Sequence, residues 1–295
     1  MARAGKAHVE SDHWLVYAIV TTVFWGVWGA FIEAPEKRGF PATLGYVVWS
    51  LTMVPCALVA LSIVDWQLET DTRSVLLGCA AGLLGAAGQL VLFDTLRRGP
   101  AYLVFPVVAL SPVVSVALSV LLLGETASPR VWTGIGLALV ALPLLAYQPP
   151  DRSGPARGRL WLAMAIAVLL AWGIQAYVLR FANATMRSEG IFFYMTATAV
   201  ALAPVAVLMT DFKRPINWGL GGPGLAAAVQ VLNSVGALMM VYAFRYGKVI
   251  IVSPMINALA PVITIVLSLL LYRVVPHKVV TAGMALAAVA FYLLA

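Results

Sequence analysis

The chain has 295 residues, of which 62% are hydrophobic, and only 31 carry a formal charge (19 basic and 12 acidic). A soluble domain is about half apolar and about a quarter charged, so this composition excludes the soluble, disordered and fibrous classes. The net charge of +7 does not indicate a nucleic-acid partner, because the lysines and arginines lie in short connections between apolar stretches, as in membrane proteins.

The charged positions divide the chain into ten charge-free windows of 17 to 30 residues. In chain order these windows are 13–32, 39–64, 74–93, 99–124, 131–150, 160–179, 190–210, 215–244, 249–272 and 279–295. A helix needs about 20 apolar residues to cross the hydrocarbon core of a bilayer. The sequence therefore predicts an all-α membrane protein of ten transmembrane helices, surrounded by membrane lipid. The first window lacks a small-residue cleavage pattern, so we expect it to be retained as a span.

Landmark residues of the first half recur in the second half at an offset of 147 to 149 positions. The pairs are Trp25 with Trp172, Pro55 with Pro204, Gly99 with Gly247, Pro106 with Pro254, Pro112 with Pro261, and Gly134 with Gly283. Weak self-similarity of any Ala/Leu/Gly-rich membrane protein is the alternative explanation. Since each half holds five spans, an odd number, the second copy would enter the membrane from the opposite side. We predict two inverted five-helix repeats, 1–149 and 157–295, joined by a linker at 150–156, as is typical of secondary transporters.

Three segments carry a resemblance to a known family. They are Phe24-Trp25-Gly26, then Arg97-Arg98-Gly99-Pro100-Ala101, and the stretch from Leu110 to Gly134, which contains Leu110-Ser111-Pro112-Val113-Val114 and Leu121-Leu122-Leu123-Gly124-Glu125. In these segments the chain resembles the drug/metabolite transporter superfamily in its ten-helix, EamA-type form. The resemblance implies a transporter of small metabolites, a cavity lined mainly by helices 1, 3, 4, 6, 8 and 9, and cytoplasmic termini. The chain departs from the family pattern at Glu33, where many members carry lysine, and at Arg273-Val274, where a Gly-Glu pair is expected.

Two windows each contain two prolines, Pro106 and Pro112 in the fourth and Pro254 and Pro261 in the ninth. Proline removes a backbone donor and clashes with the preceding turn, so both helices should bend or break and act as hinges, although static kinks are an alternative. The prolines are six positions apart in the fourth window and seven apart in the ninth. One extra residue turns a helix by about 100°. We therefore expect an irregular turn between Pro254 and Pro261, with Asn257 pointing into the cavity; the alternative is two simple kinks with Asn257 capping a neighbouring helix.

Polar and aromatic side chains inside the windows are the candidates for substrate contact. Amides in a membrane are costly unless they are bonded, so they should face the bundle interior, where bonding between helices is an equally good explanation. The candidates are Trp25, Trp28, Gln89, Ser111, Gln175, Tyr177, Gln230, Asn233 and Asn257. No carboxylate or lysine lies at the centre of a window, which predicts a neutral cavity that recognises its substrate by hydrogen bonds and shape.

Glu33 and Asp94 are the candidate proton-coupling carboxylates, because ionisable groups close to spans are often functional. Both lie at window edges, where a side chain reaches the interface at little cost. The three histidines have no metal-ligand spacing with Cys56 and Cys79, and a nucleophile elbow and a phosphate-binding glycine loop are missing from the sequence. We therefore expect no metal, no cofactor and no catalytic residue.

The sequence predicts a secondary active transporter that moves a small neutral or zwitterionic organic metabolite across the cytoplasmic (plasma) membrane by alternating access. The resemblance favours export of an amino-acid-like or drug-like compound as the leading hypothesis and uptake of a sugar or nucleobase-type compound as the alternative. A membrane-embedded enzyme is the least favoured. With cytoplasmic termini, 8 Lys and Arg residues lie inside and 11 outside, which mildly disagrees with the positive-inside rule.

Overall fold

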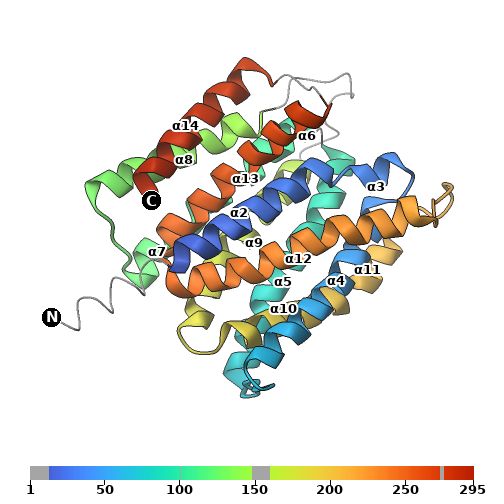
Figure 1. The fold of residues 1–295 in the computed structure, drawn as a ribbon, viewed down its shortest axis with the longest axis horizontal. Helices are drawn as coiled ribbons and strands as arrows, with labels where there is room; N and C mark the ends of the chain where they lie inside the picture. The colour runs from blue at the N-terminus through green and yellow to red at the C-terminus, as the bar shows by residue number, and fades with distance from the viewer. Residues whose placement is uncertain (1–12, 100, 148–159, 273–275) are drawn as a thin grey trace.

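The computed structural model describes residues 13–99, 101–147, 160–272 and 276–295, and these are almost entirely helical (Figure 1). The first half contains α2 (His13–Phe31), α3 (Ala34–Lys37), α4 (Ala42–Ile63), α5 (Thr72–Arg98), α6 (Ala101–Val108), α7 (Ser111–Leu123) and α8 (Pro129–Leu145). The second half contains α9 (Leu160–Asn183), α10 (Ser188–Ala201), α11 (Ala203–Leu208), η1 (Leu220–Gly224), α12 (Leu225–Tyr246), α13 (Val249–Tyr272) and α14 (Lys278–Leu294). η1 is a π-helical turn.

Every charge-free window contains helix. Within the described residues, eight helical segments are long and apolar enough to cross a membrane, and α8 and α14 are shorter apolar helices of 17 residues each. The all-α membrane class is therefore confirmed, while the count of ten spans stays a prediction. The predicted linker at 150–156 and the Arg273-Val274 pair lie outside the described residues.

The proline-containing fourth window is broken, as expected. α6 ends at Val108 and α7 begins at Ser111, with two turn residues between them. Pro106 lies inside α6, whereas Pro112 lies in the first turn of α7. The N–H groups in the first turn of a helix have no acceptor within the helix. A proline there loses no hydrogen bond, so Pro112 is well suited to start α7.

The expectation of an irregular turn in the ninth window is wrong. α13 is helical throughout, and both Pro254 and Pro261 lie inside it. Half of this span is buried inside the protein, more than of any other span among the described residues, so neighbouring helices hold it in place. One of these ties is a hydrogen bond of 2.9 Å from the Thr264 hydroxyl to the Gly26 carbonyl of α2. Packing of this kind allows the two prolines to be accommodated without loss of the helix.

Equivalent helices of the two halves make equivalent contacts. In the first half Trp25 of α2 donates from Nε1 to the Asn233 carbonyl of α12 at 3.3 Å. In the second half Trp172 of α9 donates from Nε1 to the Gly85 carbonyl of α5, also at 3.3 Å. The donors are 147 positions apart and the acceptors 148. The recurrence seen in the sequence is therefore also a recurrence of helix packing, with the first helix of each half packed against the third helix of the other.

The two ends of the bundle differ. Lys248, between α12 and α13, contacts Thr126, between α7 and α8, and Arg130 at the start of α8 contacts Tyr292 near the end of α14. Figure 1 shows that α2 begins and α14 ends on the same side of the molecule. We call this the termini end. The opposite end, where α2 leads through α3 into α4, is the pocket end.

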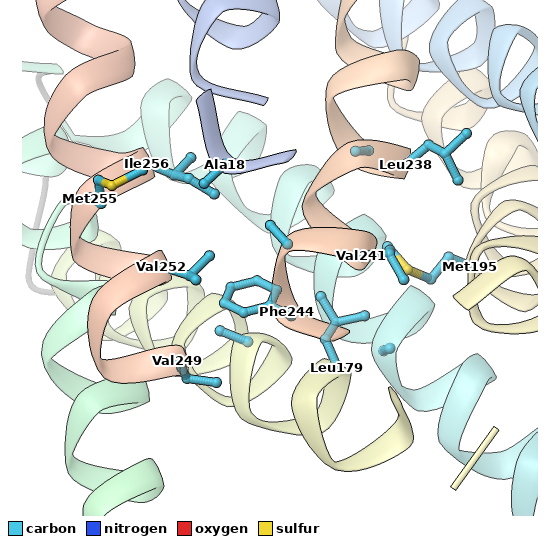
Figure 2. Close-up of a cluster of buried hydrophobic side chains, with 14 of the residues drawn as sticks. Ala18, Leu179, Met195, Leu238, Val241, Phe244, Val249, Val252, Met255 and Ile256 are labelled. Carbon is cyan, nitrogen blue, oxygen red and sulfur yellow. The ribbon is translucent and has the colours of Figure 1, made fainter. Parts of the chain in front are cut away.

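A buried apolar cluster fills the bundle near the termini end (Figure 2). It combines side chains from α2, α9, α12 and α13, and Leu179, Phe244, Val249 and Val252 are all almost completely buried. Figure 2 shows Phe244 between Val252 and Leu179, so three helices of the second half meet there. The described helices are therefore closely packed at this level of the bundle.

Candidate functional site

A pocket lies at the pocket end, between α2, α4, α5 and α12, beneath the connection that carries α3. About 50 Å³ of it is open to the centres of water molecules. Its aromatic lining consists of Trp28, Phe40, Tyr46, Trp49 and Phe93. The pocket is narrow in this structure, so a substrate requires a wider conformation.

Three amides give the pocket its polar character. The Gln230 side-chain oxygen accepts hydrogen bonds from Trp28 Nε1 at 3.2 Å and from Asn233 Nδ2 at 3.4 Å. Gln89 faces the pocket and makes no hydrogen bond with any residue that the structure describes. The free amide of Gln89 is therefore able to donate to a ligand and accept from it.

The aromatic wall on α4 contains a second unsatisfied group. Tyr46 donates its hydroxyl to the Ala199 carbonyl at 3.1 Å and packs edge-on against Trp49, with ring centroids 5.3 Å apart. The Trp49 indole nitrogen is buried and has no acceptor within the described part of the chain. A buried donor without a partner costs about 1–3 kcal/mol, so a rearrangement that supplies an acceptor is favourable.

Four of the nine predicted cavity residues line this pocket: Trp28, Gln89, Gln230 and Asn233. These residues lie in the first, third and eighth windows, which are among the helices that the resemblance implied would line the cavity. The second window also lines the pocket, which was not expected, whereas the fourth, sixth and ninth do not.

The other candidates lie elsewhere in the bundle. Trp25 and Gln175 bond backbone carbonyls of a neighbouring helix, the latter at 3.0 Å from the Ala81 oxygen, so they join helices. Asn257 donates to the Ser253 carbonyl of its own helix at 2.9 Å and does not line the pocket. Ser111 is buried at the start of α7, and Tyr177 stacks on Phe181. Asn257 is therefore not part of this pocket, and its expected position in a central cavity stays a prediction.

Both predicted coupling carboxylates form ion pairs within one helical turn. Glu33 lies 2.8 Å from Lys37, and both side chains are more than 70% exposed. Asp94 lies 3.0 Å from Arg98. Their role in coupling stays a prediction.

Sequence reasoning missed most of the aromatic wall and its one acid. Tyr46 and Trp49 lie three positions apart in the second window, a helical spacing that places them on one face. Glu36 is the one charged residue among the described residues that line the pocket, and it lies on α3, which is only four residues long. The aromatic spacing was a usable signal, whereas nothing in the sequence distinguishes Glu36 from other acids in connections.

The sequence model of the EamA-like transporter family matches twice, over residues 13–147 and 159–295. The chain belongs to the EamA-like transporter family. This assigns the protein to a drug/metabolite transporter-type family of integral membrane proteins.

Individual relatives agree with the family. An uncharacterized protein of Methanocaldococcus jannaschii is 27% identical over 135 residues, which are 46% of this chain and 97% of that protein. Protein RarD of Streptomyces exfoliatus is 26% identical over 251 residues, covering 80% of this chain and 73% of its own. A solved structure titled only as a crystal structure of a protein shares the fold, with a TM-score of 0.73 and 18% identity over 94% of this chain and 97% of its own. The first relative has about the length of one matched segment, which agrees with an EamA protein built from two copies.

Proposed function

We propose that this EamA-family protein is a secondary active transporter of a small neutral or zwitterionic organic metabolite. The observation that carries the proposal is a pocket of aromatic rings and amides at one end of a helical bundle whose other end is tightly packed. A path open at one end and closed at the other is what alternating access requires of each of its states.

The architecture that goes with this function is ten spans in two inverted five-helix repeats. The paired indole contacts of Trp25 and Trp172 support it, because each joins the first helix of one half to the third helix of the other. α8 and α14, 17 residues each, would be the fifth spans of the two halves. They are slightly shorter than the 20 residues usual for a span, within the range of about 17–25.

The pocket favours a substrate without net charge. Among the described residues that line it, Glu36 carries a charge, and the neutral polar groups are Gln89, Gln230 and Asn233. A substrate ammonium group can pair with the Glu36 carboxylate, and a substrate acceptor can bond the amide N–H groups. An amino-acid-like or drug-like compound is therefore the leading substrate class, and we propose export as the direction of transport. The five aromatic rings also suit the flat face of a sugar or a nucleobase, which supports uptake of such a compound as the second candidate.

We place the protein in the cytoplasmic (plasma) membrane with both termini in the cytoplasm. In that arrangement the pocket opens to the outside. A reporter fused after Ala295 that is active only outside the cell would reverse this orientation.

Binding and transport test the function in sequence. Purified protein is screened by thermal unfolding against amino acids, nucleobases and sugars, since a ligand that prefers the folded state raises the unfolding temperature. Each hit is then followed in sealed proteoliposomes, where the expected result is movement of the chemically unchanged compound. Chemical conversion of the compound in detergent, without a sealed compartment, would instead show a membrane-embedded enzyme.

A further inference from the structure

Glu125 lies at the termini end and reaches from the first repeat into the second. Gly124 ends α7 in the left-handed conformation (φ +63°), and the Glu125 N–H folds back to the Ser119 carbonyl at 3.1 Å. The Glu125 side chain is only 8% exposed. Its Oε2 accepts the Ile250 N–H, in the first turn of α13, at 3.1 Å. A carboxylate is favoured at a helix N-terminus, where unpaired N–H groups carry partial positive charge.

Arg180 of α9 faces this carboxylate. Its Nε lies 3.7 Å from Glu125 Oε1, and its Nη1 donates to the carbonyls of Phe244 and Arg245, at the end of α12, at 3.2 and 2.6 Å. Glu125 Oε1 makes no hydrogen bond to the described residues. The ion pair therefore joins α7 to α9 and α12, but with incomplete geometry. The Arg180 side chain is 31% exposed, so the pair is only partly desolvated.

Further contacts close the same place. Lys248 donates from Nζ to the Thr126 carbonyl at 2.7 Å, a second tie from the second repeat to the first. The buried cluster of Figure 2 lies beside the pair, since Leu179 precedes Arg180 and Phe244 accepts its hydrogen bond. The ion pair, the Lys248 hydrogen bond and the buried apolar cluster thus lie at the same level of the bundle.

The repeat does not supply the same pair at the pocket end. At the offsets of the landmarks, Arg180 corresponds to Glu33 and Glu125 corresponds to Val274. Glu33 is exposed and pairs with Lys37 of its own turn, and Val274, which lies outside the described residues, has no charge. Among the described residues, this inter-repeat ion pair lies at the termini end.

We propose that Glu125 and Arg180 form a lock that holds the two repeats together at the termini end and must separate during transport. This inference rests on the proposed transporter function, and it assigns positioning roles to two residues outside the pocket. With the lock formed, the pocket opens only at its own end. Removing either charge shifts the protein toward conformations that are open at the termini end.

A buried thiol reports the opening without any ligand. Cys56 and Cys79 are replaced by alanine, and Ser119→Cys is introduced in α7 just before the lock. Ser119 is fully buried and its hydroxyl has no partner among the described residues, so this replacement removes no side-chain hydrogen bond. The rate at which a charged methanethiosulfonate reagent modifies position 119 in detergent measures how often the termini end opens.

Glu125→Gln and Arg180→Gln are each expected to raise that rate about tenfold to a hundredfold, the factor for losing one hydrogen-bonded charged contact. The double variant should exceed neither single variant by more than a small factor, because the two residues act as one unit. The matched control is Glu189→Gln. Glu189 accepts the Tyr242 hydroxyl at 2.5 Å, also near the termini end. Tyr242 stacks on Tyr17 of the first repeat, but glutamine can still accept this bond and no inter-repeat ion pair is removed, so the rate should not change.

Unchanged labelling in both lock variants overturns the proposal, and so does an equal increase in the Glu189→Gln control. Circular dichroism and gel filtration establish that each variant is folded. If neither Glu125→Gln nor Arg180→Gln yields folded protein, the pair is structural and the lock is likewise rejected. Since the readout needs no substrate, absence of transport in liposomes would contradict the proposed function alone, whereas unchanged labelling in a protein that transports would contradict only the lock.

Discussion

Two glycines beneath the paired indoles offer a test of the repeated packing. A Cβ added at Gly88 would lie 2.5 Å from Trp172 Nε1, and a Cβ added at Gly236 would lie 2.5 Å from Trp25 Cδ1. Both distances are about 1 Å shorter than carbon contacts at their optimum of about 3.5–4.0 Å. In Gly88→Ala and Gly236→Ala each indole must therefore move and weaken its 3.3 Å hydrogen bond to the neighbouring helix.

The expected loss follows from three opposing effects. Overpacking a close contact costs about 1–3 kcal/mol, and weakening a buried hydrogen bond costs about 1 kcal/mol. Alanine in place of glycine in a helix regains about 0.5–1 kcal/mol. We expect each variant to be destabilised by about 1–3 kcal/mol, with similar values at the two positions because their surroundings are equivalent.

Denaturant unfolding of the purified protein, followed by tryptophan fluorescence, measures the change. The matched control is Gly136→Ala in α8, where an added Cβ meets no atom within 4 Å and alanine should stabilise by at most about 1 kcal/mol. If Gly88→Ala and Gly236→Ala unfold like the control, the indole packing is not as described. A large loss at one position alone would contradict the equivalence of the two contacts.

Three further predictions concern single side chains. A double-mutant cycle of Trp28→Phe with Gln230→Ala should show a coupling free energy of about 0.5–1.5 kcal/mol, the net value of one buried hydrogen bond; additive changes would show that the bond contributes nothing. Asp71→Ala should lower the unfolding temperature more than Asp71→Asn. Hydrogen bonds from Ser74 hold the pKa of Asp71 below its ordinary value, so the carboxylate's contribution is present at neutral pH and is lost as pH falls below the usual carboxyl range, which a pH series of unfolding temperatures checks. Glu33→Gln should change the unfolding free energy by less than about 0.5 kcal/mol because its ion pair is exposed. If Glu33 or Asp94 couples protons, neutralising that residue must abolish pH-driven transport in liposomes.

The membrane class, the approximate positions of the long apolar helices and the two matching halves followed from the sequence alone. These features depend on the local composition of each segment and on the match between the two halves, and both can be read from the sequence without knowing which helices are in contact. The break in the fourth window was also predictable. A proline lacks the backbone N–H that a helix interior needs, and Pro112 lies in the first turn of α7. The prediction for α13 was wrong because the packing of α2 against it, which the sequence does not display, keeps the helix regular.

Only the tertiary structure separated the residues of the pocket from the residues that join helices. Gln175 and Gln230 are equivalent as sequence features, yet one bonds a backbone carbonyl of α5 and the other lines the pocket. Glu125 was recognisable as part of a motif, but its partners, Arg180 and Ile250, lie 55 and 125 positions away. Whether a polar side chain in a membrane bundle binds a neighbour, a ligand or a charge depends on which helix faces it, and that is decided by the packing of the whole bundle.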